Sequence, residues 1–135
     1  MSRDELDDDL QRFLRDCVQS YEELEVLLLL HRDRSKEWTP VEAAAALRLT
    51  SEAAGTALEN LLASALLRRR PERRYRCEPG DPSLEALIAK LAEASIHNRI
   101  RLVQVMSKNA LDRLRVASLR TFAEAFRIKG PPKDG

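Results

Sequence analysis

The sequence predicts a mostly helical protein with one small β-hairpin. Its 135 residues are 33% charged and 4% aromatic, and alanine and leucine are frequent, as in helical soluble proteins. Apolar residues recur at spacings of three and four along most of the chain, which places them on one face of successive helices. Residues 66–77 break this pattern, because "LLRRRPERRYRC" has the form of two short strands joined by a turn.

The first two helices are expected at residues 3–18 and 20–31. The first carries one apolar stripe and begins with acidic residues, which the helix dipole favours at that end. The second begins with "SYEE", a capping box in which Ser20 accepts from the Glu23 amide and Glu23 reaches back. The apolar run "LEVLLLL" behind it needs neighbours on several sides, so this helix is expected at the centre of the core.

Two more helices follow a break at "RDRSKEWTP". Trp38 and Thr39 are expected to form a very short extended piece, and Thr39, Pro40 and Glu42 then start a short helix with a second capping box. The segment "SEAAGTALENLLASALL" is the next helix. Its leucines share one face, while Glu52 and the polar residues that follow it lie on the opposite face.

The hairpin and two C-terminal helices complete the chain. Pro71 and Glu72 suit the central positions of a tight turn between strands. Asp81 begins a long helix that extends to about residue 107, where "SKN" interrupts the apolar pattern. Asn109 and Asp112 are expected to begin a last helix that ends near residue 128.

This order of elements predicts a winged helix-turn-helix core with an N-terminal helix and two C-terminal helices. The expected divisions are an N-terminal amphipathic helix at 1–19, the winged helix-turn-helix domain at 20–80, a C-terminal helical dimerisation segment at 81–128, and a flexible tail at 129–135.

Residues 25–79, "EVLLLLHRDRSKEWTPVEAAAALRLTSEAAGTALENLLASALLRRRPERRYRCEP", resemble the winged-helix domain of bacterial MarR-like regulators. The segment "IRLVQVMSKNALDRLRVASLRTFAEAFRIK" is similar to the tail of small uncharacterised bacterial proteins grouped with them. The resemblance implies a DNA-binding transcriptional regulator. In such regulators the third helix of the winged-helix domain, here "SEAAGTALENLLASALL", reads the major groove, and we call this segment the expected reading helix.

The expected reading helix departs from that pattern in its charge. Its exposed face carries Glu52 and Glu59 and has no lysine or arginine to contact phosphates, which supply most of the affinity for DNA. The predicted hairpin at residues 66–77, which is the wing of the domain, supplies these cations instead, because it holds six arginines and one glutamate. The residues expected to contact DNA are Arg68, Arg69, Arg70, Arg73, Arg74, Arg76, Ser51, Thr56 and Asn60.

Three interpretations of this charge pattern remain open. The wing arginines contact double-stranded DNA, or the fold docks another protein as an interaction module, or the arginines are simply a solvated hairpin. The acidic start of the chain, with Asp7, Asp8 and Asp9, either improves solubility or competes with nucleic acid for the wing.

Enzymatic activity is not expected. The two cysteines, Cys17 and Cys77, and the two histidines, His31 and His97, have neither metal-ligand spacing nor catalytic neighbours in the sequence. We therefore expect no cofactor and no metal. No apolar run reaches membrane-spanning length and the N-terminal residues lack a signal sequence, which predicts a cytoplasmic protein without membrane contact.

The apolar stripes of the terminal helices predict a homodimer, because a winged core of this size cannot bury all of them. The interface is expected to use Leu87, Leu91, Ile96, Ile100, Val103, Leu114, Phe122 and Phe126. A two-fold axis would then place two wings on one side of the particle.

Overall fold

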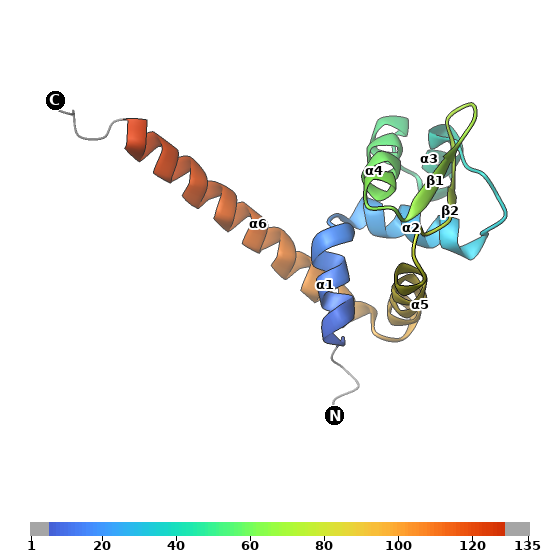
Figure 1. The fold of residues 1–135 in the computed structure, drawn as a ribbon, viewed down its shortest axis with the longest axis horizontal. Coiled ribbons are helices and arrows are strands. Elements are labelled where there is room, and N and C mark those ends of the chain that lie inside the picture. The colour runs from blue at the N-terminus through green and yellow to red at the C-terminus, as the bar shows by residue number, and fades with distance from the viewer. Residues whose placement is uncertain (1–5, 129–135) are drawn as a thin grey trace.

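The computed structural model describes residues 6–128, with side chains up to residue 125, and it confirms the predicted fold class. Six helices and one antiparallel hairpin make up these residues (Figure 1). The elements are α1 (Asp8–Cys17), α2 (Tyr21–Arg32), α3 (Pro40–Leu47), α4 (Ser51–Ala63), β1 (Leu67–Arg70), β2 (Arg74–Cys77), α5 (Pro82–His97) and α6 (Arg99–Ile128).

A winged-helix core forms around α2, which packs against α3, α4 and β2. The predicted extended piece is present, because Trp38 and Tyr75 exchange two backbone hydrogen bonds of 2.7 and 2.8 Å. This bridge adds a third, one-residue strand to the hairpin. The side chains of Leu27, Leu58 and Tyr75 are fully buried between these elements.

Side-chain hydrogen bonds to backbone amides fix the residues at which α3 and α2 begin. At α3, Glu42 N–H donates to the Thr39 hydroxyl and Thr39 N–H donates to the Glu42 carboxylate, each at 3.1 Å, so the predicted capping box is confirmed. At α2 only half of the predicted box forms. Ser20 accepts from the Glu23 amide at 3.0 Å, but the Glu23 carboxylate accepts from the Gln19 amide instead of reaching back to Ser20.

The first helix begins at Asp8, because Asp7 is its N-cap and accepts from the Leu10 amide at 2.8 Å; the predicted start at residue 3 lies outside the described residues. The Asp7 carboxylate also accepts from Lys90 of α5 at 2.9 Å, and this hydrogen bond is the main reason that the pKa of Asp7 is lowered. Asp7 therefore ties α1 to α5, while Asp8 and Asp9 remain exposed.

The boundary between the last two helices lies at Asn98, so the predicted break at residues 107–109 is wrong. Asn98 leaves the helical backbone conformation, donates its amide to Ala94 at 2.8 Å, and accepts from the Leu102 amide at 3.0 Å. Residues 107–109 lie inside one continuous helix, where Lys108 pairs with Asp112 one turn on.

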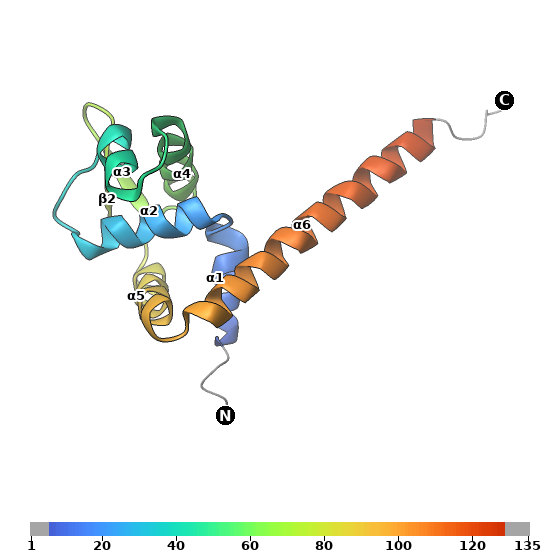
Figure 2. The ribbon, with the colours of Figure 1, turned by 180° about the vertical axis from the view of Figure 1, so that it is seen from behind.

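The last helix, α6, leaves the rest of the chain and extends away from it in both views (Figures 1 and 2). Its first turns pack through Leu102 and Val105, which are buried. Beyond Met106, none of the described side chains is buried. No described helix is both long enough and apolar enough to span a bilayer.

The chain turns from α4 into the wing at Ala65, which has a φ of 65°. Two backbone hydrogen bonds, from Ala65 to Leu62 at 3.0 Å and from Leu66 to Leu61 at 3.1 Å, form a Schellman motif. Glycine usually occupies this left-handed position because it has no Cβ, so the alanine here is strained.

Candidate nucleic-acid interface

The hairpin register places four of the wing arginines on one face. Arg68 lies opposite Arg76 and Arg70 lies opposite Arg74 across the antiparallel pair. Side chains alternate between the two faces of a strand, so these four share a face that we call the arginine face. The other face carries Tyr75, which is directed into the core.

The like charges opposite one another on the arginine face would destabilise the hairpin without acids nearby. Glu78 bridges the first pair, because its carboxylate lies 3.2 Å from Arg68 and 2.7 Å from Arg76. The hydrogen bond from Arg76 is the main cause of the lowered pKa of Glu78. The glutamate that follows β2 therefore holds two strands of like charge together.

The second pair on the arginine face is held by separate acids. Arg70 pairs with Glu37 at 3.0 Å, and Arg74 approaches Glu72 at 3.6 Å. These ion pairs are substantially exposed to solvent and contribute about 0–1 kcal/mol each. A phosphate can therefore replace such a carboxylate at small cost.

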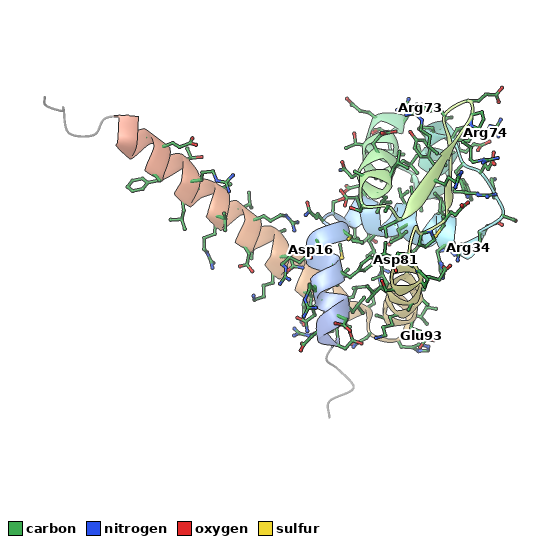
Figure 3. All side chains as sticks on the ribbon, viewed as in Figure 1. Asp16, Arg34, Arg73, Arg74, Asp81 and Glu93 are labelled. Atoms are coloured by element: carbon green, nitrogen blue, oxygen red, sulfur yellow. The ribbon has the colours of Figure 1, made fainter. Side chains whose placement is uncertain are left out.

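Arg69 and Arg73 lie on the side of the wing that faces α4, away from the arginine face. Arg73 approaches α4 so closely that a Cβ added at Gly55 would lie 3.3 Å from its Nη2 atom. Figure 3 shows Arg73 toward α4 and Arg74 on the outer side of the wing. In the sequence the six arginines form one group. In the structure four of them lie on the arginine face and two lie on the side that faces α4.

The two acidic residues on the exposed face of α4, the expected reading helix, have different roles. Glu59 accepts a hydrogen bond from the buried Tyr75 hydroxyl, and burial followed by this bond raises the pKa of Tyr75. Glu52 is exposed, and no ion pair of Glu52 occurs among the described residues. Glu59 therefore attaches the wing to α4, and this contact explains an acidic residue at that position of the helix.

The predicted DNA-contacting residues of α4 also differ. Ser51 and Thr56 are exposed, as a contact with DNA requires. Asn60 donates its side-chain amide to Glu23 of α2 at 3.0 Å. Asn60 is exposed too, but its amide is engaged by Glu23, which is 7% exposed and also accepts from the Gln19 amide at 2.8 Å.

A groove of about 690 Å³ lies between α4 and the wing. Its charged lining consists of Glu52, Glu59, Glu72 and Arg73. Three carboxylates against one guanidinium make this groove acidic, while the basic surface lies on the arginine face. The pairing of Arg70 with Glu37 joins residues far apart in the chain and has no local sequence signal.

The residues predicted for dimerisation fall into four groups. Ile96, Ile100, Val103, Leu114 and Phe122 are exposed, and Leu87 is half-buried. Leu91 is fully buried in the chain's own core, and the side chain of Phe126 lies outside the described residues. Leu111 is exposed as well and was missed, because the expected break at residues 107–109 hid its place on one continuous helix.

Within the described residues, no cluster of three or more histidine, cysteine or acidic side chains is arranged to hold a metal ion. Cys17 is half-buried and Cys77 is buried, and burial raises the pKa of both thiols. The pKa of His31 is lowered, first by burial and then by the nearby Arg34.

No family model matches the sequence, and the comparison with curated proteins finds no match. Among solved structures, the chain is similar to the crystal structure of a transcriptional regulator from Thermotoga maritima. The identity is 16%, the TM-score is 0.46, and the match covers 90% of this chain and 86% of the other.

Proposed function

We propose that the protein is a DNA-binding transcriptional regulator of the winged-helix type that contacts duplex DNA mainly through the wing. The observation that carries this proposal is the arginine face, on which the hairpin register gathers four guanidinium groups. The reading helix α4 contains no lysine or arginine, so it cannot supply the phosphate contacts itself.

Phosphate binding by the arginine face requires little rearrangement. The Arg68 side chain is 59% exposed even while it contacts Glu78. A DNA phosphate that displaces a carboxylate replaces one charge-assisted hydrogen bond by another. Such binding depends steeply on salt and discriminates weakly between sequences, since few side chains reach base edges.

Two matched double variants test which side of the wing contacts DNA. Replacing Arg70 and Arg74 with alanine removes charge from the arginine face, while replacing Arg69 and Arg73 removes the same charge from the side facing α4. We expect the first variant to lose most of the affinity. Each lost phosphate contact should also flatten the slope of log affinity against log salt by about one unit.

The measurement is fluorescence anisotropy of a labelled duplex between about 50 and 200 mM salt. The quadruple variant that combines both pairs should not bind. Glu52→Gln should bind more tightly than the wild type, because it removes a charge that repels phosphates without adding a base contact. Absence of wild-type binding at the lowest salt would contradict the DNA function.

A second candidate function is a protein-interaction module without DNA binding, and the acidic groove between α4 and the wing favours it. Glu52 and Glu72 line this groove and suit a basic segment of another protein. Under this alternative, duplex DNA does not bind at low salt. Glu52→Gln then weakens capture of a lysine- and arginine-rich peptide, whereas under the DNA function it strengthens duplex binding.

The regulator would act as a homodimer built on α6. Ile100, Val103, Leu111, Leu114 and Phe122 lie along one side of the helix, and we call this set the outer stripe. An exposed apolar surface of this length is unusual on a monomer, and a second copy of the same stripe would cover it. Light scattering should give twice the chain mass; a monomer at tens of micromolar would contradict the dimer.

A further inference from the structure

A second groove, of about 310 Å³, continues the acidic groove that lies between α4 and the wing. It lies between the start of α2 and the start of α4, and Glu52 and Thr56 of α4 line both grooves. We call the two grooves together the α4 trough. The trough therefore follows the exposed face of α4 from the turn of the wing to the first turn of α2.

The lining of the α4 trough is acidic along its whole length. It contains five carboxylates and one guanidinium, which are those of Glu22, Glu23, Glu52, Glu59, Glu72 and Arg73. Like charges gathered in a concave surface raise the local concentration of an oppositely charged partner. The trough therefore attracts cations and repels the phosphates of DNA.

Three of these carboxylates are open to a partner. Glu22 and Glu52 are exposed, and neither has an ion pair among the described residues. The Glu72 side chain is 80% exposed, and its contact with Arg74 is long, at 3.6 Å. One exposed ion pair contributes only about 0–1 kcal/mol, so a partner has to meet several of these carboxylates at once. This requirement favours a chain of cations over a single ion.

The α4 trough also offers apolar and hydroxyl surface, which suits a protein segment. Val41 is 65% exposed and lines the trough beside Pro40. The hydroxyl groups of Ser51 and Thr56 are exposed in the same part of the trough, and a hydroxyl can both donate to and accept from a peptide backbone. The surface therefore matches a segment that carries apolar side chains between its cations.

We propose that the α4 trough binds an extended segment of another protein in which lysine or arginine residues flank an apolar residue. The basic side chains pair with Glu72 at one end, with Glu52 in the middle and with Glu22 at the other end. The apolar residue packs against Val41, and the backbone of the segment bonds to Thr56. The proposal rests on the groove that favours the second candidate function and names the partner that this groove takes.

The same interaction is compatible with DNA, because the trough and the arginine face lie on different sides of the wing. Arg73 lines the trough, whereas Arg74 lies on the outer side (Figure 3). A duplex on the arginine face therefore leaves the trough open. In such a complex α4 docks a protein instead of reading bases, which accounts for the absence of lysine and arginine from this helix. Simultaneous binding rests on the proposed DNA contact, whereas binding of the segment does not.

Fluorescence anisotropy of a labelled peptide that alternates arginine and valine tests the trough on the full chain at about 50 mM salt. Glu52→Gln combined with Glu72→Gln should weaken binding about tenfold, because two exposed ion pairs are lost. Glu22→Gln should weaken it severalfold, since it removes the carboxylate at the far end. Arg73→Ala should strengthen binding, because it removes a cation from the trough.

Glu93→Gln combined with Glu124→Gln is the matched control for the double variant. Both glutamates are exposed, they lie on α5 and α6 outside the trough, and their replacement changes the net charge equally. Figure 3 shows Glu93 far from the wing. Loss of binding in the trough variants but not in the control supports the proposal. An equal loss in the control overturns it, as does absence of binding by the wild type. Displacement of the peptide by spermidine at equal concentration also overturns it, because any polycation would then suffice.

Simultaneous binding has a separate readout. Unlabelled duplex added to the peptide complex should raise the anisotropy further, and Arg70→Ala with Arg74→Ala should abolish this rise while the peptide affinity stays unchanged. Displacement of the peptide by the duplex overturns simultaneous binding. If no duplex binds, the proposed DNA function fails and the peptide titration alone decides the trough. If duplex binds and the peptide does not, only the trough is overturned.

Discussion

The winged-helix core and the outer half of α6 use the same kinds of residue with opposite results. Leu58 of α4 is fully buried by α2 and the wing, whereas Leu114 of α6 is 65% exposed. Both are leucines on amphipathic helices, so helix propensity does not distinguish them. The difference teaches that the core is completed within one chain, whereas α6 presents apolar surface that only another molecule can cover.

The largest effect should come from Leu58→Ala, which leaves a cavity at the centre of the core. We expect it to lower the free energy of unfolding by about 3–4 kcal/mol, as for other buried leucines. The matched control is Leu114→Ala, which should change it by less than about 0.5 kcal/mol when the protein is monomeric. Urea unfolding measures both, and equal losses would show that α6 is packed within the chain.

A smaller loss is expected for Glu23→Ala, because the winged-helix core depends on this buried carboxylate. Its removal leaves the Gln19 amide and the Asn60 side chain without their acceptor. We expect a loss of about 1–2 kcal/mol in the free energy of unfolding, because Gln19 and Asn60 are exposed and water replaces part of what they lose. Glu22→Ala is the control, since Glu22 is exposed and its loss should have little effect. Equal unfolding midpoints for the two variants would refute the role of the network.

Local signals account for the parts of the fold that the sequence could predict. The capping box at Thr39 involves residues three apart, and the alternation around Tyr75 is confined to one strand. The boundary at Asn98 could not be predicted in this way. Asn98 and Asn109 are both good starts for a helix, and the choice depends on Leu102 packing in a core that includes α1 and α5.

The candidate interface was predictable only in its composition. The arginines are visible in the sequence, and Ser51 and Thr56 are exposed on α4 as expected. The contacts that organise the surface join distant residues, such as Glu37 with Arg70 and Glu59 with Tyr75. Such contacts follow from the hairpin register and from packing, which no spacing in the sequence reveals.

A gain of stability is expected from Ala65→Gly at the turn between α4 and the wing. Glycine adopts the left-handed conformation of this residue without the steric cost of a Cβ. We expect a gain of about 0.5–1 kcal/mol, after the entropy that glycine adds to the unfolded chain. Ala46→Gly, in the exposed part of α3, should instead lose about 0.5–1 kcal/mol. A loss in both variants would show that Ala65 is not strained.

The smallest effect on folding should come from Leu114→Asp, although its effect on assembly should be large. The side chain touches no core residue that would suffer from a charge, so the unfolding of the monomer should change by less than about 0.5 kcal/mol. In a dimer formed by two outer stripes the same carboxylate would be buried without a partner, which is unfavourable enough to separate the chains. Ala123→Asp adds the same charge on the opposite side of α6 and should leave the dimer intact. Sedimentation of the two variants therefore distinguishes a dimer on the outer stripe from one on any other face of the helix.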